Sequence, residues 1–84
     1  MEKDDLRELA RNASRQPFRI RMTGGEVFDV RHQDFISVSD YHGSVIMVEE
    51  GKEHMHIFTL LNISTIEMLP TAAEAESSTN GESA

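Results

Sequence analysis

Cysteine is absent from this chain of 84 residues, and long hydrophobic runs are absent as well. Without cysteine the chain has no disulfide framework and no thiolate zinc site, which is compatible with a reducing compartment. No apolar run approaches the roughly 18 residues of a membrane span. The N-terminal stretch MEKDDLRELARN is charged and lacks the apolar centre of a signal peptide. We therefore expect a soluble cytoplasmic protein with no membrane partner.

Basic residues are scarce relative to acidic ones. Eight Lys and Arg against fifteen Asp and Glu give the chain a net charge of −7. Proteins that bind nucleic acid usually present a basic face that displaces counterions from phosphates. The charge balance therefore disfavours RNA as a partner.

The chain is also too short for a deep interior. A domain near this size buries only about 60% of its unfolded surface, so its stability is marginal unless chains associate. No serine lies in a nucleophile motif, and the glycines of TGGE lack the lysine and the following helix of a phosphate-binding loop. We predict that the protein is not an enzyme and has no catalytic residue and no cofactor.

A short amphipathic helix is predicted from Asp4 to Ala13. Its apolar stripe has the i, i+3, i+4, i+7 spacing of one helix face and consists of Leu6, Leu9, Ala10 and Ala13. Asp4 and Asp5 can cap its start, Glu8 follows Asp5 at capping-box distance, and Pro17 prevents continuation. So short a helix is unstable alone, so we expect its stripe to pack on the rest of the fold.

From Phe18 onward the hydrophobic period changes to two, which indicates strands. FRIRM and VFDV flank TGGE and predict a hairpin in which Gly25 takes positive φ at the end of a three-residue loop. This register places Phe18 opposite Val30, Ile20 opposite Phe28, and Arg19 opposite Asp29. Apolar residues then share one face and an ion pair lies on the other.

Shorter strands are predicted in DFISVS, SVIMVEE, HMHIFTLL and ISTIEML. Two of them are apolar on both faces, so we expect the interior to cover one face and the helix or a second chain to cover the other. The residues concerned are Val45, Ile46, Met47, Val48, Ile57 and Phe58.

The predicted organisation is a helix and linker over residues 1–17, a small barrel over 18–69, and a disordered acidic tail over 70–84. The predicted core contains Phe18, Ile20, Met22, Phe28, Val30, Ile36, Val38, Ile63 and Ile66.

The helix, the glycine-turn hairpin, the long second strand and the closing NISTIEML together resemble the Sm-like (LSm/Hfq-like) small β-barrel superfamily. The ending ISTIEMLP is similar to the last strand of Hfq-like proteins. The resemblance implies a mainly β fold, with a short N-terminal α-helix followed by a five-stranded, strongly bent antiparallel SH3-like barrel. It also implies that LLN is a 3₁₀ turn between the fourth and fifth strands, and that these strands pair between subunits of a ring. Short bacterial proteins with a PF and LL-I pattern are similar too, but carry no known activity to transfer.

The positions that would contact RNA depart from that family pattern. The Lys-His pair of Hfq-like proteins aligns with Leu60 and Leu61, neither of which can contact phosphate or hydrogen-bond a base. For the loop residues that contact RNA in Sm proteins, this chain has only Asp40 and Asn62 as loose matches. We therefore expect at least one of the two leucines to plug the barrel end or an interface, in place of an RNA site.

Histidine is the candidate metal ligand of this chain. His54 and His56 fall on one strand face, and with His32 or His42 they could ligate a metal. No carboxylate or thiol completes a recognisable set, so loop and surface histidines without a metal are the favoured interpretation.

Three arginines of the first hairpin are weak candidates for binding an anion. Arg19, Arg21 and Arg31 could form a basic patch. The favoured interpretation pairs them with Asp29, Glu26 and Asp34, at about 0–1 kcal/mol for each exposed pair.

The sequence favours a non-catalytic interaction module that self-associates, and the alternative is an Sm-like RNA-binding regulator. The candidate interface or packing residues are Leu60, Leu61, Met47, Ile57 and Phe58.

Overall fold

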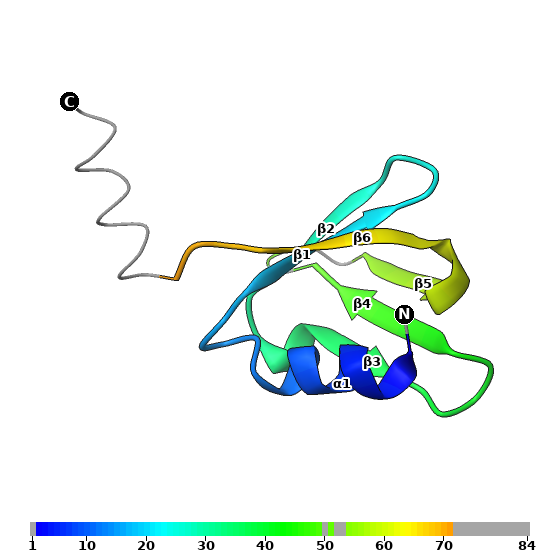
Figure 1. Ribbon diagram of the computed structural model, residues 1–84, viewed down its shortest axis with the longest axis horizontal. Coiled ribbons are helices and arrows are strands. Elements are labelled where there is room, and N and C mark those ends of the chain that lie inside the picture. The colour runs from blue at the N-terminus through cyan, green and yellow to red at the C-terminus, as the bar shows by residue number, and fades with distance from the viewer. Residues whose placement is uncertain (1, 50, 52–53, 72–84) are drawn as a thin grey trace.

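The computed structural model describes residues 2–49, 51 and 54–71, and its fold is mainly β (Figure 1). The elements are α1 (Lys3–Arg11), β1 (Phe18–Met22), β2 (Val27–Val30), η1 (Gln33–Phe35), β3 (Ile36–Val38), β4 (Ser44–Val48), β5 (Met55–Thr59), η2 (Leu60–Asn62) and β6 (Ile63–Met68), of which η1 and η2 are 3₁₀ turns. The predicted mainly β class with one N-terminal helix is confirmed. The strands form two three-stranded antiparallel sheets, in the orders β2-β1-β6 and β3-β4-β5, and the described residues do not close them into one barrel. The tail predicted to be disordered lies, from residue 72 onward, outside the described residues.

The β1–β2 hairpin has the predicted register. Phe18 pairs with Val30, Arg19 with Asp29 and Ile20 with Phe28. The N–H of Gly25 donates to the carbonyl of Met22 at 3.0 Å, and Gly25 has a φ of 100°, which glycine adopts without a Cβ penalty. The three-residue loop is therefore confirmed as well.

The turn η1 takes the chain from the first sheet to the second. His32 precedes it, and the Nδ1 atom of this ring accepts a hydrogen bond from the backbone N–H of Asp34 at 3.1 Å. The two sheets also meet through aromatic rings, since Phe28 on β2 stacks on Phe58 of β5 with ring centroids 5.5 Å apart. The sheets therefore share one interior.

The helix α1 packs against β3 through its predicted stripe (Figure 1). Leu6 and Ala10 are buried and Leu9 is half-buried, as expected, but the helix ends at Arg11 and not at the predicted Ala13, which is buried in the turn that follows. The predicted capping box is wrong, because Glu2 occupies the N-cap position and no side chain caps the helix. Asp4 and Asp5 lie in the first turn, where their charge opposes the positive end of the helix dipole.

All predicted core residues belong to one hydrophobic cluster. Five of them are buried, namely Phe18, Ile20, Met22, Val30 and Ile36, and the other four pack against these. The cluster also takes in Val45 and Met47 of β4 and the helix stripe.

The strands β4 and β5 are covered on one face only. Val45 and Met47 point into the interior, whereas Ile57 is 68% exposed and Met55 64% exposed. The helix packs on β3 and is therefore not the second cover of β4 and β5. No helix in the described part of the chain is long and apolar enough to cross a membrane.

Candidate functional site

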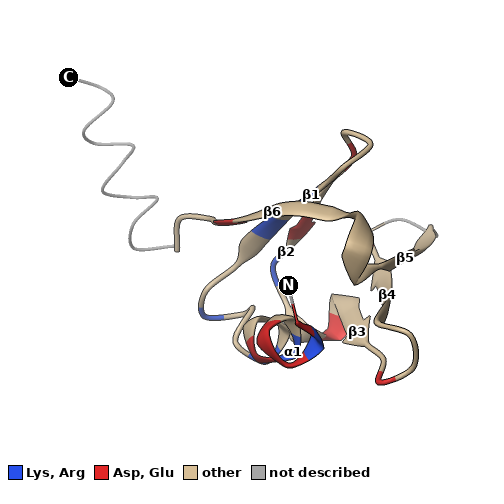
Figure 2. Cartoon of the chain, turned by 45° about the vertical axis from the view of Figure 1, so that its right-hand side comes forward, with Lys and Arg blue, Asp and Glu red and all other residues tan. Residues whose placement is uncertain are grey.

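The outer surface of β4 and β5 carries four apolar side chains in adjacent pairs. The register places Ile46 opposite Ile57 and Val48 opposite Met55, on the sheet face that points away from the interior. We call these four residues the apolar face. Neither β4 nor β5 contains Lys, Arg, Asp or Glu, as the absence of blue and red on both strands shows (Figure 2). Adjoining apolar residues on a water-exposed face are typical of an interaction surface.

The apolar face lies beside an open strand edge. β5 is the last strand of its sheet and pairs only with β4, and β6 is the last strand of the other sheet and pairs only with β1. Their free sides present backbone N–H and C=O groups that no strand of the described chain pairs. Such edges can add a strand from another chain.

The turn η2, which the resemblance implied, joins these two edge strands, and its leucines have different surroundings. Leu60 is half-buried and packs against the core, and a Cβ on Gly43 would lie 3.3 Å from its Cδ1 atom. The backbone N–H of Leu60 also donates to the carbonyl of Gly43 at 2.9 Å. Leu61, in contrast, is 91% exposed. Leu60 is therefore a packing residue, whereas Leu61 does not pack on the core of the single chain.

The remaining interface or packing candidates also fall into two groups, one packed on the core and one exposed. Met47 is buried, and Phe58 packs on the core and stacks on Phe28, so both are packing residues. Ile57 belongs to the apolar face. The structure thus brings Ile57 and Leu61 to the surface at opposite ends of one short segment, and places the other candidates inside.

Ion pairs cover the outer surface of the other sheet. Arg19 Nε donates to Asp29 Oδ1 at 2.7 Å, Arg21 Nε bonds to Glu67, and Arg31 Nη2 lies 3.7 Å from Asp29 Oδ2. The hydrogen bond from Arg19 lowers the pKa of Asp29 below its ordinary value, and that from Arg21 lowers the pKa of Glu67.

The arginines are therefore paired, as the favoured interpretation held, but two of the predicted partners are wrong. Arg21 pairs with Glu67 on β6 rather than with Glu26, because β6 lies on the free side of β1. Arg31 turns back to Asp29 rather than to Asp34, whose carboxylate lies 3.5 Å from His32. With carboxylates in contact, these three arginines do not form a free basic patch.

The histidines do not form a metal site with other side chains of the described residues, since no group of three or more His, Asp or Glu lies close enough to hold an ion. His56 faces the interior beside Phe28, with ring centroids 4.7 Å apart, and its Nε2 atom lies 3.5 Å from Glu49 Oε1. His54 lies just before β5, and His42 has a φ of 56° in the turn before β4.

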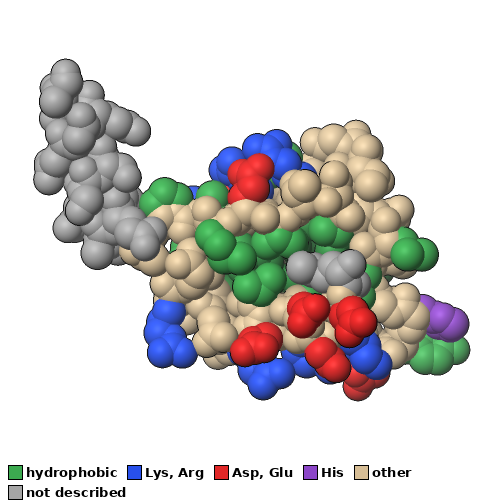
Figure 3. Space-filling view, viewed as in Figure 1, with side chains coloured by type: hydrophobic (Ala, Val, Ile, Leu, Met, Phe, Trp, Pro, Cys, Tyr) green, Lys and Arg blue, Asp and Glu red, His purple; other side chains and the backbone are tan. Residues whose placement is uncertain are grey.

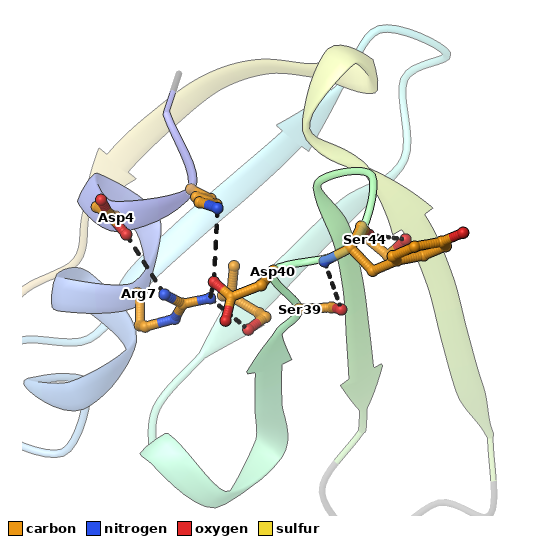
Figure 4. A network of polar contacts seen from close by, with 8 residues as sticks. Asp4, Arg7, Ser39, Asp40 and Ser44 are labelled. Carbon is orange, nitrogen blue, oxygen red and sulfur yellow. Dashed lines mark hydrogen bonds and ion pairs between the residues drawn. The ribbon is translucent and has the colours of Figure 1, made fainter.

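A contact between α1 and the β3–β4 turn escaped the sequence analysis (Figure 4). Arg7 Nη2 donates to Asp40 Oδ1 at 2.8 Å and to the carbonyl of Val38 at 3.0 Å, and Arg7 Nη1 reaches Asp4. The bond from Arg7 lowers the pKa of Asp40. Of Arg7 and Asp40, only Asp40 was singled out from the sequence, as a loose match to a loop residue of Sm proteins.

Serine side chains hold the same turn. The Oγ atom of Ser39 accepts from the N–H of Tyr41 at 3.0 Å, and the Oγ atom of Ser44 donates to the carbonyl of Tyr41 at 3.0 Å. These bonds fix the turn as a docking point for the helix.

No protein-family model, no curated protein and no solved structure matches this chain.

Proposed function

We propose that this chain is a non-catalytic, cytoplasmic interaction module that associates with further copies of itself. The observation that carries the proposal is the apolar face beside the open edge of β5. Apolar side chains on an unpaired edge strand are a liability that a partner removes by covering them. The perturbed carboxylates of Asp29, Asp40 and Glu67 all lie in surface ion pairs, an arrangement that fits a structural role better than catalysis.

We further propose an Sm-like barrel as the fold behind this association. η1 separates β2 from β3 by only a short turn, so the two count as one long, bent strand, and the six strands then correspond to five. In that scheme, the free edge of β5 in one copy pairs with the free edge of β6 in the next. The exposed Leu61, in the turn between these edges, would become buried between copies.

RNA binding is the alternative function that the Sm-like resemblance implies. The paired state of Arg19, Arg21 and Arg31 and the net charge of −7 speak against it. Added salt should change the binding affinity in opposite directions for the two functions. Salt screens the repulsion between acidic chains and so strengthens self-association, whereas it weakens phosphate contacts steeply.

The association is tested by light scattering of the purified chain and of two matched variants. Ile57→Lys places a charge on the apolar face, and Val27→Lys places the same charge on the outer surface of the other sheet, where Val27 is 41% exposed. We expect the unmodified chain and Val27→Lys to have the mass of an oligomer and Ile57→Lys to have the mass of one chain. A single-chain mass for the unmodified protein across the concentration range refutes the proposal.

A further inference from the structure

A groove of about 470 Å³ runs along one side of α1, and none of the four residues of the apolar face is among those that line it. Its lining residues recur at helical spacing and are Asp5, Glu8, Leu9, Asn12 and Gln16. Gln16 ties the linker after the helix to the end of β6, because its Nε2 atom donates to the carbonyl of Leu69 at 2.8 Å. The volume falls within the range of about 300–1,000 Å³ that is usual for binding clefts.

The interior of the fold is incompletely covered on the inward face of β6. Ile66 and Met68 pair with Ile20 and Phe18, so they lie on the inward face of their sheet. Both partners are fully buried, yet Met68 is 53% exposed and Ile66 is only half-buried. Figure 3 shows hydrophobic side chains gathered between the acidic side chains of α1 and the strand above them. Apolar surface that belongs inside the sheet is therefore left open to solvent here.

The rim of this groove has unbalanced negative charge. Within the described chain, Asp4, Asp29, Asp40 and Glu67 each contact an arginine. Asp5 and Glu8 have no ion-pair partner among the same residues. The groove thus combines an apolar wall at Leu9 with two carboxylates that form no ion pair within the described chain, and the nearby Arg15 donates through Nη2 to Asn12 Oδ1 at 2.9 Å.

We propose that this groove binds a peptide segment of another protein, in which apolar side chains are flanked by lysine or arginine. Apolar side chains fit between Leu9 and the inward face of β6, and the flanking bases pair with Asp5 and Glu8. The net charge of −7 also attracts a basic partner over a distance. This binding is independent of self-association through the apolar face.

The chain's own tail is a poor occupant of the groove. Beyond Pro70 the sequence contains Glu74, Glu76 and Glu82 and neither Lys nor Arg. Like charges on the rim and on the tail repel each other. Charge complementarity therefore favours a basic partner over the tail.

Fluorescence anisotropy with a short labelled peptide of leucine and lysine tests the proposal on the full chain. Two peptides of the same length serve as controls, one with serine in place of leucine and one with glutamate in place of lysine. We expect the leucine-lysine peptide to bind most tightly and to shift the backbone NMR signals of α1 and β6. Binding of the serine-lysine peptide with equal affinity overturns the proposal, because charge alone would then account for it.

Matched charge variants locate the site. Glu8→Gln removes a carboxylate from the rim, and Glu26→Gln removes one from the exposed hairpin loop, so both change the net charge equally. Glu8→Gln should bind the leucine-lysine peptide about twofold more weakly, and the double variant Asp5→Asn/Glu8→Gln roughly fivefold more weakly, since each exposed charge pair contributes modestly. Glu26→Gln should bind as the unmodified chain does, and so should Ile57→Lys.

Two results would contradict this proposal. Equal losses in Glu8→Gln and Glu26→Gln show that the peptide senses net charge and not the groove. Loss of peptide binding after deletion of residues 72–84 shows that the peptide binds the acidic tail and not the groove. Helix content measured by circular dichroism confirms that the variants keep α1.

Discussion

The two sheets of this chain share an interior but differ in their outer surfaces. On β1, β2 and β6 most outward side chains are charged and form ion pairs between strands, such as Arg19 with Asp29. On β4 and β5 the outward side chains carry no charge, and most of them are apolar, as with Ile46 opposite Ile57. Since both sheets have three strands and the same antiparallel pairing, strand geometry does not cause the difference. One outer surface is mostly charged, and the other leaves apolar side chains exposed to solvent.

The largest expected effect tests the interior that both sheets share. Ile20→Ala in the first sheet and Met47→Ala in the second each remove a buried side chain, so each should lower the free energy of unfolding by about 2–5 kcal/mol. Chemical denaturation followed by circular dichroism measures this. We expect one cooperative transition in both variants, and two separate transitions would show that the sheets unfold independently.

The two leucines of η2 give the next largest contrast. Leu60→Ala removes a half-buried packing residue and should cost roughly 1–2 kcal/mol in the single chain. Leu61→Ala should change the stability of the single chain by less than about 0.5 kcal/mol, because its side chain is in solvent. Thermal unfolding of both variants in the Ile57→Lys background separates chain stability from association.

In the associating chain, Leu61→Ala should also lower the oligomeric mass at a given concentration. An unchanged mass would place Leu61 outside the contact between copies, and would limit that contact to the strands.

A smaller effect is expected on the charged surface. Asp29→Asn removes the acceptor of Arg19 and should cost at most about 1 kcal/mol at neutral pH. The pKa of Asp29 is lower in the folded than in the unfolded chain, so its contribution is present above its ordinary pKa of 3.8 and is lost as pH falls through the folded value. Urea denaturation from pH 7 to pH 2 should show the difference between variant and unmodified chain vanish at the acid end. A difference that persists there would assign the effect to packing instead of charge.

The smallest effect concerns the C-terminal tail. Deleting residues 72–84 should leave the thermal midpoint within about a degree or two, because a segment so poor in large apolar residues has little to bury. Differential scanning calorimetry measures the midpoint. A larger drop would mean that the tail packs on one of the two surfaces.

The sequence predicted best what depends on neighbours along the chain. The hairpin register follows from the alternation around TGGE, and the helix stripe follows from four apolar positions. The partner of Arg21 was missed because Glu67 is far along the chain and meets it only through the β1–β6 pairing. The contact of Arg7 with Asp40 was missed for the same reason.

The candidate site was predicted only in part, because a pattern of apolar residues does not say what covers them. Alternation indicated that both faces of β4 and β5 are apolar, but not that the helix would lie on β3 and leave one face open. Adjacent leucines in LLN looked equivalent in sequence. The 3₁₀ turn directs one of them onto the core and the other into solvent.

The turn stabilised by Ser39 and Ser44 contains the residue that dominates the intrinsic fluorescence of this protein. Tyr41 is the only tyrosine, the sequence has no tryptophan, and this ring is 74% exposed with its centroid 4.1 Å from that of His42. Its ultraviolet emission therefore arises at the docking point of α1 and not in the core. Quenching of this fluorophore should follow the release of the helix, whereas the packing around Phe18 does not affect it. A tryptophan introduced at Phe28 would give the sheets an optical signal of their own.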